Sequence, residues 1–212
     1  MMTAQGVQAM GPILEQAQRT CIHLQLPPAL HLSDDQLFEL CRINRELRIE
    51  RTALGNLIIM SPTGSETGAR NASLTGQLWL WNRSTQMGQV FDSSSGFTLP
   101  NGAMRSPDAA WIRQDRWAAL HPEQKKKFAP ITPDFVAELK SPTDDLADLK
   151  AKMQEYIDNG VLLGWLLDPE QRQVWIYRPG LEAEILNNPV YISDARLHDF
   201  KLKTASVFSQ TT

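Results

Sequence analysis

Three charged residues at two points of the chain have the types and spacing of a metal-dependent hydrolytic site. Asp108 follows Pro107 at the start of an apolar run, and thirty residues later Glu138 and Lys140 flank a single leucine. Two carboxylates suit a hard cation such as Mg²⁺, or Mn²⁺ in its place, whose other ligands are waters and a substrate phosphate. The metal would activate a bound water, while Lys140 orients that water or neutralises the developing charge. The pattern predicts a phosphodiester-hydrolysing site, although so short a pattern also arises by chance from surface charges and a turn aspartate.

The segment from 133 to 142 is the predicted strand that carries Glu138 and Lys140. Its residues alternate with period two, so that apolar side chains share one face and the two charged side chains share the other. Pro133 and Pro142 bound the segment, because proline cannot donate a hydrogen bond within a central strand. A buried charged face is costly, so this face either contacts water or lines a site.

The elements before this strand are predicted from caps, turns and periodicity. Ser33-Asp34-Asp35-Gln36 is a capping box that opens a helix, and Leu54-Gly55-Asn56 marks a hairpin. Segments 89–92 and 96–99 are interpreted as paired strands around a serine turn. A helix is predicted from 65 to 82, with an apolar stripe made by Leu74, Leu78 and Trp81. Its second stripe is polar and is interpreted as a solvated face, made by Glu66, Arg70, Ser73 and Gln77.

A strand–helix–strand crossover follows. The segment 144–159 has the periodicity of an amphipathic helix, and the segment 161–167 has the composition of a buried strand. A strand at 173–177 is predicted to form a hairpin with it, and short edge strands are predicted at about 182–186 and 190–193. The order of these elements predicts a mixed α/β fold with one strand–helix–strand crossover.

Length and composition indicate one ordinary globular domain. We expect residues 31–212 to form it, with an N-terminal helix and hairpin, and residues 1–30 to be an arm packed on it. The net charge of -3 argues against coating nucleic acid through bulk charge. Two cysteines and four histidines form no zinc pattern. The sequence shows no signal peptide, and its longest apolar run is too short to span a bilayer, so we expect a cytoplasmic protein without a membrane partner.

Several motifs together resemble the Uma-two family of restriction-endonuclease-like proteins, which is part of the PD-(D/E)xK nuclease superfamily. The resemblance covers roughly residues 33 to 180, and its specific part is the run from 136 to 169. The motifs that carry it are Met60-Ser61-Pro62-Thr63-Gly64 followed by Glu66, Gly96-Phe97-Thr98-Leu99-Pro100, Ser106-Pro107-Asp108-Ala109, Val136-Ala137-Glu138-Leu139-Lys140-Ser141-Pro142, Lys152-Met153-Gln154-Glu155-Tyr156-Ile157-Asp158-Asn159-Gly160-Val161 and Gly164-Trp165-Leu166-Leu167-Asp168-Pro169.

The resemblance implies a fold, a cofactor and site residues. The fold is a restriction-endonuclease-like core, a central mixed β-sheet flanked by helices. The cofactor is Mg²⁺, in a phosphodiesterase site built from Asp108, Glu138 and Lys140, and Glu66 is implied to support the metal or orient its ligands. The implied reaction is hydrolysis of DNA phosphodiester bonds by a metal-activated water.

The chain departs from the family pattern at two positions. Many members carry a histidine where this chain has Thr67, so no imidazole is expected there. Many members also lack a lysine matching Lys140 and keep the one matching Lys152. Lys152 flanks the apolar stripe of its predicted helix and could reach the site, or it could form a surface pair with Asp148. We favour Lys140 over Lys152 as the catalytic lysine.

Two further classes of function compete with the metal-dependent DNA endonuclease. One is a catalytically inactive nuclease-fold module that binds nucleic acid or assembles with a partner, since fold alone does not determine function. The other is a hydrolase that acts on RNA or on a small phosphodiester. A homodimer is expected for the endonuclease, because cutting both strands of a duplex requires two sites related by a two-fold axis.

Overall fold

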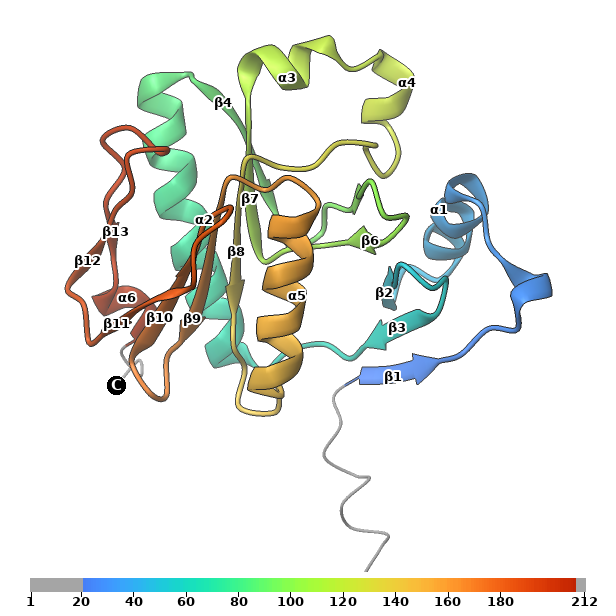
Figure 1. Cartoon of the computed structure of the whole chain (residues 1–212), viewed down its shortest axis with the longest axis horizontal. Coiled ribbons are helices and arrows are strands. Elements are labelled where there is room, and N and C mark those ends of the chain that lie inside the picture. Colours follow the sequence, from blue (N-terminus) through green and yellow to red (C-terminus); the bar gives the residue numbers. More distant parts are fainter. Residues whose placement is uncertain (1–20, 209–212) are drawn as a thin grey trace, which may run out of the picture.

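The computed structural model describes residues 21–208, which form a six-stranded sheet, a five-stranded sheet and the helices around them (Figure 1). The six-stranded sheet has the strand order β11-β10-β9-β8-β7-β4. Its strands are β4 (Gly88–Asp92), β7 (Ala109–Arg113), β8 (Phe135–Leu139), β9 (Leu163–Asp168), β10 (Gln173–Tyr177) and β11 (Glu184–Asn187). Only β8 and β9 pair in parallel, and every other pair in this sheet is antiparallel. The expected central mixed sheet flanked by helices is therefore confirmed.

The parallel pair is the product of the predicted crossover. Strand β8 leads to helix α5 (Leu146–Asp158), which returns the chain to β9 at the side of β8. The Asp145 carboxylate caps this helix by accepting hydrogen bonds from the backbone N–H groups of Ala147 and Asp148. All residues of β8 and β9 are buried, as expected for strands covered on both faces. Glu138 is therefore inside the protein and does not face water.

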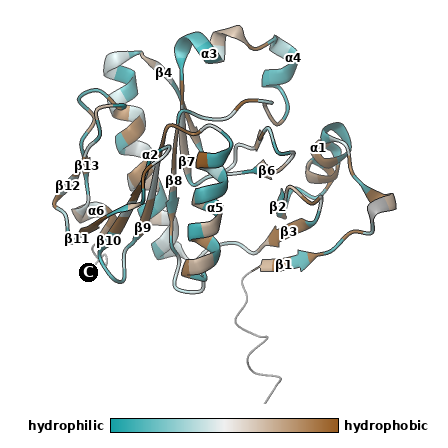
Figure 2. Cartoon of the chain, in the orientation of Figure 1, coloured by the Kyte–Doolittle hydropathy of each residue, from teal (hydrophilic) through white to brown (hydrophobic). Residues whose placement is uncertain are grey.

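Two helices cover the two faces of this sheet (Figure 1). Helix α2 (Ser65–Thr85) places Leu74, Leu78 and Trp81 in one hydrophobic cluster, with alternate residues of β7, β8 and β9. Helix α5 places Met153 and Tyr156 in a second cluster. The other alternate residues of the same three strands, such as Ala110, Val136 and Leu166, belong to this second cluster. The central strands are largely hydrophobic between these two helices (Figure 2). Glu138 is thus a charged residue on an otherwise apolar strand, on the face that α5 covers.

The five-stranded sheet has the strand order β1-β3-β2-β6-β5 and lies beside α5 (Figure 1). Its strands are β1 (Cys21–Leu24), β2 (Arg48–Arg51), β3 (Leu57–Met60), β5 (Phe97–Thr98) and β6 (Met104–Arg105). Helix α1 (Asp34–Ile43) packs Leu37 against its buried residues, and Ser33 and Gln36 form the predicted capping box. The predicted hairpin is β2–β3. A single-turn 3-10 helix, η2 (Pro28–Leu30), precedes α1.

The predicted arm lies partly outside the described residues. Residues 1–20 are not described, whereas β1 forms an antiparallel pair with β3. The boundary between an arm and a domain at residue 30, with one domain from 31 to 212, stays a prediction.

The interpretation of 89–92 and 96–99 as paired strands is wrong. Strand β4 pairs with β7 in the six-stranded sheet, and β5 pairs with β6 in the five-stranded sheet. The serine turn between them therefore carries the chain from one sheet to the other. Strand-like segments separated by a short turn look alike in sequence whether they pair with each other or with other strands.

The interpretation of the polar stripe on α2 as a solvated face holds for Glu66, which is half exposed, but it is wrong for the other three residues. Arg70 is buried, and Gln77 and Ser73 form hydrogen bonds with Lys203 and Ser206. These contacts come from a later part of the chain, in which β12 (Tyr191–Ile192) pairs with β13 (Leu202–Lys203) and α6 (Ala205–Phe208) follows. Helix α2 is thus covered by polar contacts as well as apolar ones.

Two short helices, α3 (Gln114–Ala119) and α4 (Pro122–Lys125), connect β7 to β8. Within residues 21–208, no helix combines the length and the apolar character that crossing a membrane requires.

Candidate active site

The predicted acid Glu138 lies on β8, and the predicted acid Asp108 directly precedes the neighbouring strand β7. In the antiparallel register of β7 and β8, Ala109 pairs with Ala137, so the next positions along the two strands are Asp108 and Glu138. The Asp108 Oδ2 atom accepts a hydrogen bond of 2.9 Å from the backbone N–H of Leu139. Both acids are almost fully buried, with 8% and 4% of their surface exposed. Residues thirty positions apart in sequence are therefore brought together at one end of the sheet.

A lysine reaches these acids from helix α5. The Lys152 Nζ atom lies 2.8 Å from Glu138 Oε1. Tyr156, one helical turn later, donates its hydroxyl hydrogen to the same Glu138 oxygen at 2.9 Å. Residues four positions apart project from the same face of a helix, so both side chains point at Glu138. The helix of the crossover thus supplies the cation that contacts the strand carboxylate.

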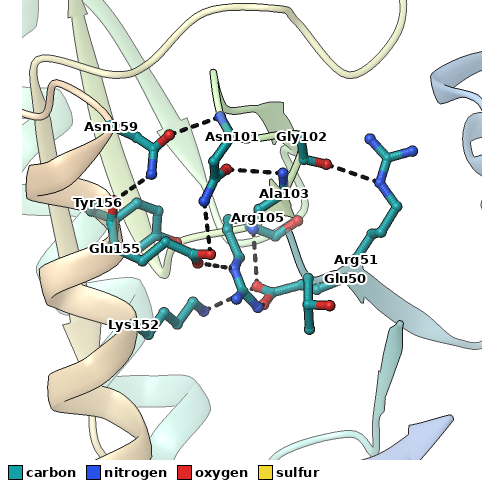
Figure 3. Close-up of polar contacts among 12 residues, drawn as sticks. Glu50, Arg51, Asn101, Gly102, Ala103, Arg105, Lys152, Glu155, Tyr156 and Asn159 are labelled. Carbon is teal, nitrogen blue, oxygen red and sulfur yellow. Dashed lines mark hydrogen bonds and ion pairs between the residues drawn. The ribbon is translucent and has the colours of Figure 1, made fainter. Parts of the chain in front are cut away.

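Glu50 on strand β2 joins the site from the other sheet (Figure 3). Its side chain is 2% exposed, and its Oε1 atom lies 3.0 Å from Lys152 Nζ. It also accepts hydrogen bonds from the Ser106 backbone N–H at 2.9 Å and from Arg105 Nη1 at 3.1 Å. Arg105 in turn donates to Glu155 on α5 at 2.6 Å. A continuous chain of buried and partly buried charges therefore links the five-stranded sheet to α5.

The two glutamates that share Lys152 have pKa values shifted in opposite directions. Burial raises the pKa of Glu138 to about 7, because the attraction of Lys152 is outweighed by desolvation and by repulsion from Asp108 and Glu50. Burial also acts to raise the pKa of Glu50, but Lys152, Arg105 and a backbone N–H lower it to about 2. Glu50 is thus a permanent carboxylate, whereas Glu138 can take up a proton near neutral pH.

The remaining ionisable groups of the site are shifted as well. Burial raises the pKa of Asp108, against an opposing attraction from Arg48. Burial acts to lower the pKa of Lys152, but the two glutamates outweigh it, so that the pKa lies above its ordinary value. Lys152 is therefore an ammonium group throughout the physiological pH range.

Two polar side chains surround Asp108 and have unused hydrogen-bonding atoms. Asn71 of α2 donates from Nδ2 to Asp108 Oδ1 at 3.2 Å, and Arg48 Nη1 lies 3.7 Å from the same oxygen. The Oδ1 atom of Asn71 and the Nε atom of Arg48 are buried, and neither has a hydrogen-bond partner among the described residues. Buried polar atoms without a partner are costly, which is consistent with a ligand that these atoms would contact.

The other two predicted site residues lie apart from this group. Lys140 follows the end of β8, donates to the Ser141 carbonyl at 3.2 Å and has its Nζ atom 3.7 Å from Glu170. Glu66, in the first turn of α2, is half exposed and pairs with Arg70 at 2.6 Å. Within residues 21–208, neither side chain forms a hydrogen bond or ion pair with Asp108 or Glu138. The structure therefore brings together Asp108, Glu138 and Lys152, and not Lys140 or Glu66.

The donor set fits a hard divalent cation bound in part by the protein. Mg²⁺ is commonly held by one or two carboxylates, with waters and substrate phosphates as its other ligands. Asp108 and Glu138 supply the carboxylates, and the unpartnered Oδ1 of Asn71 is a neutral oxygen beside them. In the described part of the chain, no group of three or more His, Cys, Asp or Glu side chains is arranged to hold a metal. A cation would favour the ionised form of Glu138, whose pKa is raised by burial and by repulsion from Asp108 and Glu50.

Sequence reasoning did not identify Glu50 as a site residue. The available signal was the strand Arg48-Ile49-Glu50-Arg51, in which three charges occupy four positions. Three of these four residues are buried, and Arg48 is partly buried. A charge-rich strand within a hydrophobic hairpin indicates that its charges have partners elsewhere in the protein.

Comparisons with known proteins identify a family and a structural neighbour. Residues 34–205 match the model of the Uma2 family, which is described as "Putative restriction endonuclease". A solved structure with the same fold is that of a putative nuclease belonging to DUF820 from Anabaena variabilis ATCC 29413. Its TM-score is 0.67 at 20% sequence identity, and the match covers 84% of this chain and 97% of the other. The comparison with curated proteins gave no match.

Proposed function

The chain belongs to the Uma2 family, and from this premise we propose that it is a Mg²⁺-dependent endonuclease that hydrolyses DNA phosphodiester bonds. The observation that carries the proposal is the meeting of Asp108 and Glu138, on adjacent strands, with the Lys152 ammonium group 2.8 Å from Glu138. This is the chemistry predicted for two carboxylates and a lysine, with the lysine supplied by helix α5.

Each side chain has a role in the proposed reaction. Asp108 and Glu138 would hold Mg²⁺, or Mn²⁺ in its place, and Asn71 would add a neutral oxygen. When bound, the metal polarises the scissile phosphate and activates a water for attack. Glu66 would act indirectly. Its ion pair with Arg70 orients that residue, which directly precedes Asn71 on α2. Tyr156 fixes the orientation of Glu138 by donating to its Oε1 atom.

Lys152, and not Lys140, is assigned as the lysine of the site. Its raised pKa keeps it protonated, so it is suited to neutralise negative charge on a phosphate and not to accept a proton. Lys140 is proposed to be structural, since its contacts are with Ser141 and Glu170.

The test is cleavage of supercoiled plasmid DNA by purified protein in the presence of Mg²⁺ or Mn²⁺. Wild-type protein is expected to nick the plasmid, and Asp108→Asn and Glu138→Gln are expected to abolish nicking while the circular dichroism spectrum is unchanged. Equal nicking by the wild type and both variants would show that a contaminating nuclease is responsible and would refute the proposal.

A second candidate is an inactive nuclease-fold module that binds nucleic acid or a partner. The charge network favours it, because Lys152 already pairs with both glutamates and could take the place of a metal. Calorimetric titration with Mn²⁺ separates the two candidates. Retention of DNA without Mn²⁺ binding at low millimolar concentration would favour the inactive module.

Substrate and assembly extend the same proposal. DNA is proposed as the substrate, and competition of plasmid cleavage by RNA or a small phosphodiester would show a different preference. A homodimer in the cytoplasm is proposed as the working form, because two sites are needed to cut both strands of a duplex. Sedimentation equilibrium of the purified protein tests the dimer, and a monomer at all concentrations would contradict it.

A further inference from the structure

Lys152 has two carboxylate partners that belong to different parts of the fold. Glu138 lies on β8 of the six-stranded sheet, and Glu50 lies on β2 of the five-stranded sheet. The Lys152 Nζ atom is 2.8 Å from the first carboxylate and 3.0 Å from the second. The ammonium group therefore bridges the two sheets at the centre of the site.

The two partners differ in what else they bind. Glu50 is held by the Ser106 backbone N–H and by Arg105, and these contacts fix both of its oxygens (Figure 3). Glu138 accepts only from Lys152 and Tyr156 among the described residues, and both donate to its Oε1 atom. Glu50 is thus fixed in place by three donors, whereas Glu138 keeps one oxygen available for another ligand.

A cation bound at Glu138 would compete with the Lys152 ammonium group for the same carboxylate. Two positive charges close together repel, and the repulsion is strong where water is excluded. Without a second partner, Lys152 would leave the site or weaken the binding of the cation. Glu50 supplies that second partner, because its carboxylate already forms a direct ion pair with Lys152.

We propose that Glu50 is a positioning residue that acts through Lys152, holding the ammonium group beside the reacting phosphate when Glu138 binds the metal. This inference rests on the proposed function and extends it: the five-stranded sheet contributes to the site through one buried carboxylate.

The experiment compares Glu50→Gln with a matched control, Glu155→Gln. Both variants remove one carboxylate partner of Arg105, but only Glu50 also contacts Lys152. The full-length wild type, the two variants, Lys152→Met and the double variant Glu50→Gln/Lys152→Met are each titrated with Mn²⁺ by calorimetry. Plasmid cleavage is measured on the same preparations, and thermal unfolding shows that each variant is folded at the assay temperature.

The expected result is a coupling between Glu50 and Lys152. Glu50→Gln lowers kcat about 10-fold to 100-fold with little change in KM, as is typical when a supporting partner is lost, and Glu155→Gln stays within about 3-fold of wild type. Glu50→Asp, which keeps the charge, restores part of kcat. Glu50→Gln weakens Mn²⁺ binding in the wild-type background, because Lys152 then pairs with Glu138 alone. In the Lys152→Met background it has no further effect on binding or cleavage.

Three outcomes would overturn the inference. One is an equal effect of Glu50→Gln on Mn²⁺ binding with and without Lys152, since Glu50 would then act directly on the cation. Another is an equal loss in Glu155→Gln, which would indicate a general role of the Arg105 network. The third is no Mn²⁺ binding by the wild type. Mn²⁺ binding with the expected coupling but without plasmid cleavage would support the role of Glu50 and refute the nuclease proposal alone.

Discussion

Replacing Glu138 by glutamine is expected to make the metal-free protein more stable at pH 8 while it abolishes cleavage. The pKa of Glu138 is about 7 in the folded protein, against an ordinary value of 4.5. Between these two values the folded protein keeps a proton that the unfolded chain has released, so stability falls as the pH rises through this range. At about 1.4 kcal/mol per pKa unit, the ionised carboxylate lowers the free energy of unfolding by about 3 kcal/mol at pH 8. Glutamine has nearly the same shape and carries no charge, so it removes this penalty.

Glu50→Gln is the contrasting variant, because the pKa of Glu50 is about 2 and lies below its ordinary value of 4.5. Its charge therefore stabilises the folded protein at every pH above about 5, and its removal is expected to lower the free energy of unfolding by about 3 kcal/mol. Two substitutions of the same type, at carboxylates that share Lys152, are thus predicted to change stability in opposite directions.

Guanidinium chloride unfolding in EDTA at pH 5 and pH 8 measures both effects. The gain from Glu138→Gln should be about 3 kcal/mol at pH 8 and about 1 kcal/mol at pH 5, where the wild-type carboxyl group is already protonated in the folded state. The loss from Glu50→Gln should be nearly the same at both pH values. The claim that the ionised Glu138 carboxylate destabilises the folded protein would be refuted by a loss of stability in Glu138→Gln at pH 8. A gain in stability that does not depend on pH would also refute it.

Four more substitutions have expected outcomes. Lys152→Met should lower plasmid cleavage by at least about 100-fold and Lys140→Met by less than about 3-fold, and the reverse order would return the catalytic role to Lys140. Gly88→Ala should lower the free energy of unfolding, measured by denaturant titration, by about 3 kcal/mol or more. The reason is that the new methyl group would collide with the Ile112 backbone carbonyl. A neutral result would show that β4 and β7 can separate. Leu78→Ala should cost about 2–5 kcal/mol in the same assay, because the side chain is fully buried, and a loss below about 1 kcal/mol would contradict tight packing of α2.

The crossover at the centre of the fold could be predicted because its signals are local. Strand β8 has period-two alternation, α5 has a helical stripe and an aspartate cap, and β9 is a short apolar run. The positions of Asp108 and Glu138 followed from the same elements. The Uma2 resemblance, confirmed by the family match, added the expectation of a central mixed sheet flanked by helices.

Strand periodicity could not predict which of the two lysines contacts Glu138. Alternation places Lys140 on the same side as Glu138, but β8 ends at Leu139, and beyond that residue the side chain turns to Glu170. Lys152 contacts Glu138 only because α5 folds back over the sheet. Distances between a helix and a strand depend on tertiary packing, which sequence spacing does not specify.

Glu50 was missed, and most of the polar stripe of α2 was misinterpreted, for the same reason. Their partners lie far away in the sequence: Lys152 is 102 positions from Glu50, and Ser206 is 133 positions from Ser73. A charged or polar residue looks the same in sequence whether water or another side chain satisfies it. Only the complete fold distinguishes the two cases.

Residues 202–206 cover α2 but are synthesised long after it, and this has a consequence for folding during translation. Gln77 donates hydrogen bonds to the Lys203 carbonyl and the Ser206 hydroxyl and accepts one from the Lys203 backbone N–H, and these residues are translated 126 to 129 positions later. At ordinary elongation rates of 5–20 residues per second, this interval lasts roughly 6 to 26 seconds. During that time the growing chain would present an incomplete helix surface at the ribosome. Chaperones that bind nascent chains would therefore have access to this face of α2 until residues 202–206 are synthesised.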